Sequence, residues 1–75
     1  MTLDTVPLDV PVRVLGYAGL GPFDKERLAS LGLRPGVSVV KILKTPLQDP
    51  VECLVGSQLL AIEVRLLPHI RVEAA

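Results

Sequence analysis

The chain has 75 residues, 49% of them hydrophobic, and eight Lys and Arg side chains balance eight Asp and Glu. This length allows one domain, 1–75, with a single core, and the apolar content excludes intrinsic disorder. Zero net charge and only two aromatic residues, Tyr17 and Phe23, argue against a protein that neutralises nucleic-acid phosphates or stacks bases. We therefore expect no nucleic-acid partner.

The beginning of the chain and its uncharged runs bear on its location. Acidic residues but no Lys or Arg precede Arg13, so the first residues do not form a signal peptide. The longest uncharged runs, 14–23 and 53–62, are shorter than the roughly 17–25 residues that a membrane helix needs. The single cysteine, Cys53, fits a reducing compartment. We expect a cytoplasmic protein without direct membrane insertion.

The first third of the chain predicts an extended segment and a strand. Residues 1–9 contain Pro7 and precede Pro11, and prolines remove backbone donors and favour extended conformations. Residues 11–15 alternate valine with arginine, which predicts a strand that ends at Gly16. The glycines of 16–22 lack the spacing of a phosphate-binding loop, so this stretch is interpreted as a connector.

A helix is predicted from Pro22 to the residue before Gly32. Proline is well placed at the first helical position, and glycine can adopt the left-handed conformation that ends a helix. We expect Phe23, Leu28 and Leu31 to share the face of this helix that packs on the core. The following Pro-Gly pair, 35–36, predicts a type II turn in which the glycine has a positive φ.

The second half of the chain predicts four more short strands. They are expected at 37–44, 51–55, 59–62 and 70–72, with a proline-bounded loop at 45–50 and one helical turn at 63–67. Five short strands and one helix between the first and second strands predict a mainly β domain, a small closed or nearly closed barrel.

Few residues offer catalytic or metal chemistry. The only histidine, His69, could pair with Cys53, but the sequence shows no third group that would orient such a base, so Cys53 is interpreted as a small core residue and His69 as exposed. A zinc site needs four ligands, and the spacing of Asp49, Glu52 and Glu63 does not indicate a site for a harder cation. We expect a non-enzyme without a cofactor or a tight metal site.

Two motifs resemble the FeoA family (ferrous iron transport protein A). They are Arg27-Leu-Ala-Ser-Leu-Gly-Leu-Arg-Pro-Gly36 and Thr45-Pro-Leu-Gln-Asp-Pro50. Proteins of that family have an arginine- and leucine-rich helix that ends in Leu/Met-Gly-Leu-x-Pro-Gly, then a strand, then Ala-Pro-Leu-Gly-Asp-Pro. The spacing between the motifs and the closing Ile-x-Val at 70–72 also match, so the resemblance covers essentially the whole chain.

The resemblance implies an SH3-like barrel and a non-catalytic cytoplasmic accessory protein of ferrous iron uptake. Its implied partner is the cytosolic GTP-binding part of the FeoB-type membrane permease. The alternative is an SH3-like regulatory domain, related to the C-terminal domain of metal-dependent transcriptional repressors, although the chain shows no helix-turn-helix pattern. Homo-oligomer formation stays open.

Three residues depart from the family pattern: Thr45 replaces alanine, Gln48 replaces glycine, and Glu63 stands where arginine is usual. We expect the partner contact around the 45–50 loop and the turn after the helix. Leu47 either folds back onto the barrel or projects between its flanking prolines as an apolar anchor. The residues expected to contact the partner are Leu33, Arg34, Leu47, Gln48 and Asp49.

Overall fold

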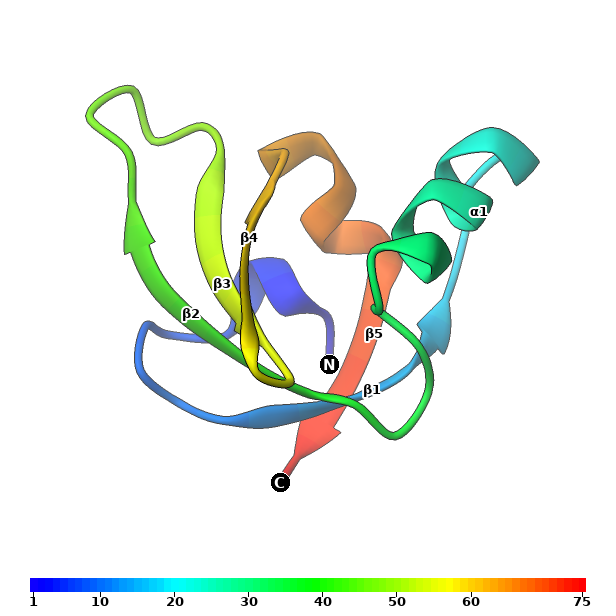
Figure 1. Cartoon of the computed structure of the whole chain (residues 1–75), viewed down its shortest axis with the longest axis horizontal. Helices are drawn as coiled ribbons and strands as arrows, with labels where there is room; N and C mark the ends of the chain where they lie inside the picture. Colours follow the sequence, from blue (N-terminus) through cyan, green and yellow to red (C-terminus); the bar gives the residue numbers. More distant parts are fainter.

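The computed structural model describes residues 1–75, apart from the side chain of Lys44. It contains five strands, one α-helix and two short 3-10 helices (Figure 1). In chain order they are η1 (Leu3–Thr5), β1 (Val12–Tyr17), α1 (Pro22–Ser30), β2 (Ser38–Lys44), β3 (Val51–Val55), β4 (Gln58–Ile62), η2 (Val64–His69) and β5 (Ile70–Ala74). Apart from η1, the expected order of strands and helices is confirmed, with element ends shifted by one or two residues.

The strands form one antiparallel sheet in the order β4-β3-β2-β1-β5. The sheet curves around the core, and β4 and β5 form its two edges (Figure 1). The expectation of a closed barrel is therefore not confirmed, because β4 and β5 do not pair with each other. Mainly β architecture, five strands and one helix between β1 and β2 are confirmed.

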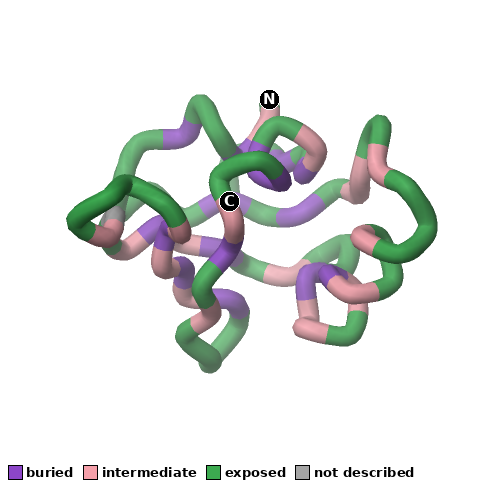
Figure 2. The backbone as a smooth tube through the Cα atoms, turned by 90° about the horizontal axis from the view of Figure 1, so that it is seen from above, coloured by how far each residue is buried: buried purple, intermediate pink, exposed green. Residues whose placement is uncertain are grey.

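The core fills the concave side of the sheet. Alternate residues of the strands point into it, so buried and exposed positions alternate along the chain (Figure 2). In β3, for example, Val51, Cys53 and Val55 are buried and the residues between them are not. The core position expected for Cys53 is thus confirmed.

The first residues are not simply extended, which corrects the prediction for 1–9. Leu3–Thr5 forms a 3-10 turn, and both Leu3 and Val6 belong to the core. Burial of these two side chains outweighs the preference of the neighbouring prolines for extended backbone. The Nζ of Lys41, a buried residue of β2, donates hydrogen bonds to the carbonyl oxygens of Leu3 at 2.9 Å and Asp4 at 3.4 Å.

Two glycines shape the turn between α1 and β2 as predicted. Gly32 has a φ of 98° and Gly36 a φ of 92°, values at which a side chain would strain the backbone. The Leu33 N–H bonds the carbonyl of Leu28 at 3.1 Å, which closes the helix end.

The prediction for Phe23 is wrong. It does not pack on the core with Leu28, since 78% of its surface is exposed. The two residues are five positions apart in the chain, which places them about 140° apart around the helix axis. Leu28 is buried, and Leu31, the C-cap residue that follows α1, is half-buried.

Candidate partner-binding surface

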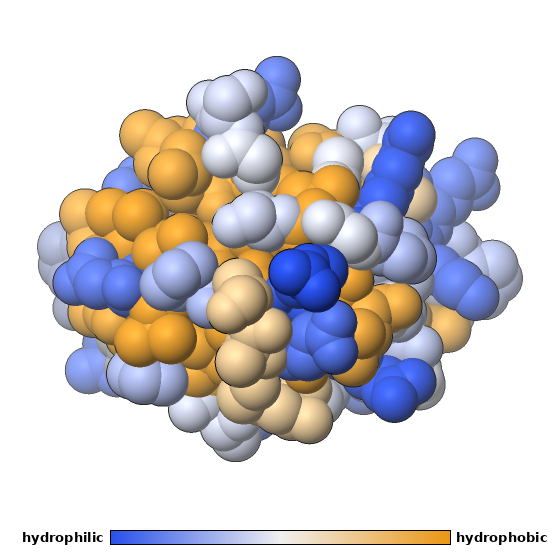
Figure 3. Space-filling view, turned by 90° about the horizontal axis from the view of Figure 1, so that it is seen from below, coloured by the Kyte–Doolittle hydropathy of each residue, from blue (hydrophilic) through white to orange (hydrophobic). Residues whose placement is uncertain are grey.

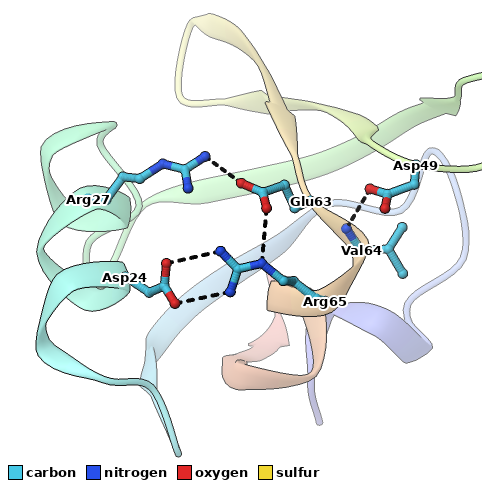
Figure 4. Close-up of polar contacts among 6 residues, drawn as sticks. All are labelled: Asp24, Arg27, Asp49, Glu63, Val64 and Arg65. Atoms are coloured by element: carbon cyan, nitrogen blue, oxygen red, sulfur yellow. Dashed lines mark hydrogen bonds and ion pairs between the residues drawn. The ribbon is translucent and has the colours of Figure 1, made fainter.

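Three segments distant in sequence lie at one end of the molecule: α1, η2 and the 45–50 loop (Figure 1). We call the outer sides of these segments the helix–loop surface. Side-chain hydrogen bonds and ion pairs join η2 to each of the other two segments (Figure 4). The surface is therefore one connected unit.

A chain of four charged residues connects α1 to the beginning of η2 (Figure 4). Arg27 lies 2.6 Å from one oxygen of Glu63, whose other oxygen lies 3.0 Å from the Nε of Arg65. The two terminal nitrogens of Arg65 bind the two oxygens of Asp24 at 3.0 and 3.1 Å. Such a two-point contact orients both groups better than a single ion pair does.

This network gives a physical reason for the unusual residue at position 63. The carboxylate of Glu63 lies between the guanidinium groups of Arg27 and Arg65. An arginine at this position would add a third positive charge to that space, and like charges at such distances repel. The departure from the family pattern thus matches the local charges of this chain.

Asp49 joins the loop to η2. Its Oδ1 accepts a hydrogen bond from the N–H of Val64 at 3.0 Å, so it caps the first turn of η2 from outside the helix (Figure 4). The backbone that it bonds is 15 residues further along the chain. One of its carboxylate oxygens is thus already used within the protein.

The middle of the loop faces solvent. Leu47 is 89% exposed, so it projects outward and does not fold back onto the sheet. Gln48 is also exposed, and its φ of 63° is in the left-handed region that glycine favours. Gln48 therefore adopts a backbone conformation that a glycine would adopt without strain.

The turn after α1 does not join this surface, and the expectation for Leu33 is wrong. Leu33 is fully buried, so it cannot contact a partner. Arg34 is exposed, and its Nε donates to the carbonyl of Ala29 at 3.0 Å, at the end of α1. The seven residues of β2 separate it from the 45–50 loop, a length of about 20 Å for a strand. The four exposed candidates therefore lie in two separate places, Arg34 in the turn after α1 and the other three in the 45–50 loop.

The sequence did not indicate the outer side of α1 as part of the surface. There the exposed Phe23 lines a shallow groove of about 410 Å³, together with Glu26, Arg27 and Ser30. These residues recur at the three- and four-residue spacing of one helix face. The sequence shows this spacing. The prediction that Phe23 packs on the core, however, gave no reason to expect an exposed face that includes Phe23. Arg27 belongs to both the groove and the ion-pair network.

The carboxyl groups of Asp24 and Glu63 are held in their charged forms. The hydrogen bond from Arg65 lowers the pKa of Asp24, and those from Arg27 and Arg65 lower the pKa of Glu63. Both carboxylates therefore stay ionised at neutral pH and present fixed charges. Groups with lowered acid pKa values are poor proton donors at that pH.

Cys53 and His69 have separate structural surroundings. Burial raises the pKa of the Cys53 thiol to about 11, which suppresses the reactive thiolate. His69, at the end of η2, is half-buried and more enclosed than predicted; its Nδ1 lies 2.8 Å from the carbonyl oxygen of Ala18. Among the described side chains, no three His, Cys, Asp or Glu residues lie together as metal ligands.

The described part of the chain also has no helix that combines the length and the apolar character needed to span a membrane.

Comparison with known proteins assigns the family. The family model of the FeoA domain matches residues 1–74. Search of the curated proteins yields no match. Among solved structures, FeoA from Stenotrophomonas maltophilia in complex with zinc, described as a procaryotic SH3 domain protein and a candidate ferrous iron transport activating factor, is 28% identical. The match covers 97% of this chain and 89% of that one, with a TM-score of 0.81.

Two further structures agree. FeoA from Chlorobium tepidum is 27% identical, with a TM-score of 0.89 and coverage of 99% of this chain and 70% of that one. Iron(II) transport protein A from Clostridium thermocellum is 28% identical over the whole of this chain, with a TM-score of 0.86, and this chain spans 46% of its length. The family match over nearly all residues and the SH3-like neighbours show that this chain belongs to the FeoA family, which is associated with ferrous iron transport.

Proposed function

We propose that this protein is a non-catalytic cytoplasmic accessory protein of ferrous iron uptake that binds the cytosolic GTP-binding part of an FeoB-type permease. Family membership supports the link to iron transport. The observation that carries the binding role is Leu47, which projects into solvent with 89% of its surface exposed. We assign the contact to the helix–loop surface, with Leu47 as its main anchor and Gln48 beside it.

The surroundings of Leu47 favour tight contact with a partner. Pro46 and Pro50 restrict the loop backbone, and the bond from Asp49 to Val64 holds the loop against η2. A loop that is already ordered loses less conformational entropy on binding than a flexible one. A fixed apolar side chain among polar neighbours is the usual composition of an interface hot spot.

Phe23 supplies a second apolar contact across the ion-pair network. Between Phe23 and Leu47 the surface carries two acids and two arginines that already pair with one another. These paired charges present a polar but neutral middle to the partner, so association depends on the two apolar side chains more than on net charge. Arg34 lies outside this surface and contributes to binding only if the partner extends along β2.

A binding measurement with the isolated cytosolic domain of the same organism's permease tests the proposal. Leu47→Glu should weaken binding by about 30-fold or more, the loss expected for a hot-spot residue. Phe23→Ala should weaken it by about tenfold. Leu59→Glu is the matched control, because Leu59 is also an exposed leucine but lies on β4, and it should bind like the parent protein.

The same variants report on function in cells. In a strain that lacks the native protein, Leu47→Glu should fail to restore ferrous iron uptake, whereas Leu59→Glu should restore it. Unchanged binding and uptake with Leu47→Glu would show that the loop is not the contact. If the parent protein does not bind the permease domain, the proposed function is wrong, and association with a DNA-binding protein would favour the alternative of a regulatory domain.

A further inference from the structure

The two edges of the sheet differ in whether another segment of the chain covers their outer backbone groups. At β5, the N-terminal segment covers the edge: Thr2 forms a bridge with Arg71, and the N–H of Val72 bonds the carbonyl of Met1 at 2.9 Å. At β4, none of the described residues pairs with the outer side of the strand. The β4 sequence Gln-Leu-Leu-Ala-Ile also lacks the charges, prolines and bulges that usually protect an edge.

The register of the β3–β4 hairpin shows which backbone groups are open. Val55 pairs with Gln58 across a two-residue turn, and hydrogen-bonded and non-hydrogen-bonded pairs alternate from there. The N–H and C=O groups of Leu59 and Ala61 therefore point away from β3. No hydrogen bond among the described residues uses either N–H group.

The convex face next to this edge is apolar. Val40, Leu54 and Leu59 lie side by side on β2, β3 and β4, and none of them is fully buried. Leu59 is 67% exposed. Seen from below, the molecule carries broad apolar areas with a few charged side chains between them (Figure 3).

We propose that β4 is a dimerisation strand that pairs antiparallel with β4 of a second copy of this chain. A two-fold axis at Leu60 places Leu59 opposite Ala61 of the second copy, and Ala61 opposite its Leu59. Each of these two pairs exchanges two N–H···O=C bonds, so the four open N–H and C=O groups of each chain are all used. The two five-stranded sheets become one continuous ten-stranded sheet.

The chemistry of the edge favours a second copy as the occupant. Because β4 carries no charge, two copies meet without like-charge repulsion. The large Leu59 faces the small Ala61, so the side chains on the convex face fit without crowding. The apolar row Val40, Leu54, Leu59 then meets Ala61 of the second copy, with Glu52 of that copy beyond it, and the two Glu52 carboxylates are separated by the two β4 strands.

The surface area buried between the two β4 strands indicates how tightly the dimer should form. A pair of five-residue strands buries less surface than a standard stable interface of about 1,600 Å². The dimer should therefore form reversibly, with a dissociation constant between about 10 µM and 1 mM.

Sedimentation equilibrium over this concentration range, combined with amide NMR, tests the proposal on the full chain. The parent protein should shift from monomer to dimer, and concentration-dependent shifts should centre on Leu59–Ala61. Leu59→Glu and Ala61→Pro should each raise the dissociation constant about tenfold or more. Proline is tolerated at an edge position whose N–H faces outward, so Ala61→Pro should keep the fold. Leu47→Glu, on the helix–loop surface, is the control and should dimerise like the parent.

Circular dichroism shows that each variant is folded before its association is compared. If the parent stays monomeric up to about 1 mM, the proposal is wrong. It is equally wrong if folded Leu59→Glu and Ala61→Pro dimerise as well as the parent. Concentration-dependent shifts confined to another surface, such as the groove beside Phe23, would also overturn it.

Discussion

The edges β4 and β5 of the same sheet are stabilised by different means. The β5 edge is held by the N-terminal segment, which adds a bridge at Thr2 and buries Leu3 in the core. The β4 edge has an open backbone, and the chain that follows it is held by the ion pairs of Glu63 and Arg65. Burial anchors both sides of this small domain, since Ile62 of β4 and Leu66 and Leu67 of η2 also belong to the core, but only the β5 edge has its outer backbone covered by another segment.

This difference has consequences for stability. Burial of an apolar side chain contributes on the order of 1.5–3 kcal/mol, whereas an exposed ion pair contributes about 0–1 kcal/mol. The N-terminal segment should therefore add more stability to the β5 edge than the exposed ion pairs add to the chain that follows β4. An edge whose backbone groups are already open is also one that can accept another strand.

The largest effect should come from comparing two leucines, one at each edge. Leu3→Ala leaves a cavity under the N-terminal segment and should lower the free energy of unfolding by about 2–5 kcal/mol. Leu59→Ala removes an exposed side chain and should change it by no more than about 0.5 kcal/mol. Urea unfolding at low protein concentration, where the chain is monomeric, measures both. Equal losses in the two variants would remove the distinction between the edges.

Lys41 should show a smaller effect on the closed edge. Its buried ammonium group holds the carbonyl oxygens of Leu3 and Asp4, and so joins η1 to β2. Lys41→Met keeps most of the side-chain volume but removes these donors. The free energy of unfolding should fall by about 1–3 kcal/mol, the cost of leaving a buried acceptor unpaired.

Hydrogen exchange locates the effect of Lys41→Met. Amides of η1 and of the Thr2–Arg71 bridge should exchange faster, and amides of β4 should exchange as in the parent protein. Faster exchange at both edges would indicate that Lys41 stabilises the sheet as a whole and not its closed edge.

The sequence predicted most of the fold because its signals are local. Strand alternation, Pro22 at the helix start and Gly32 and Gly36 at the turn each report on a few neighbouring residues, and the structure agrees with them. Closure of the barrel could not be predicted, since it depends on whether β4 and β5 meet. The N-terminal segment was misjudged for a similar reason, because only contact with the core shows that Leu3 is buried.

The candidate site was less predictable because it depends on long-range contacts. The family motif indicated the 45–50 loop, but a motif does not say which way a side chain points. Leu47 proved exposed and Leu33 buried, although both are leucines beside proline-containing turns. The link from Asp49 to Val64 and the network around Glu63 join segments 15 to 41 residues apart. Such pairings leave no periodic signal in one sequence.

The smallest effect should come from the ion pairs that follow the open edge. Their hydrogen bonds lower the pKa of Asp24 below its ordinary 3.8 and that of Glu63 below its ordinary 4.5. A carboxyl group with a lower pKa in the folded than in the unfolded state stabilises the fold above its ordinary pKa, and that contribution disappears as the pH falls through the folded value. Stability should thus be constant near neutral pH and decrease slightly as the pH falls below about 4.5.

Carboxyl carbon NMR measures the two pKa values directly. Arg65→Gln removes a hydrogen-bond donor from both acids, so both pKa values should rise toward their ordinary values, with the larger change at Asp24, for which the bond to Arg65 is the main cause of the shift. Arg13→Gln is the matched control, because Arg13 pairs with Glu73 at the β5 side and should leave both unchanged. Ordinary pKa values for Asp24 and Glu63 in the parent protein would show that the ion pairs do not hold the chain after β4, and the open edge would then lack the support assigned to it.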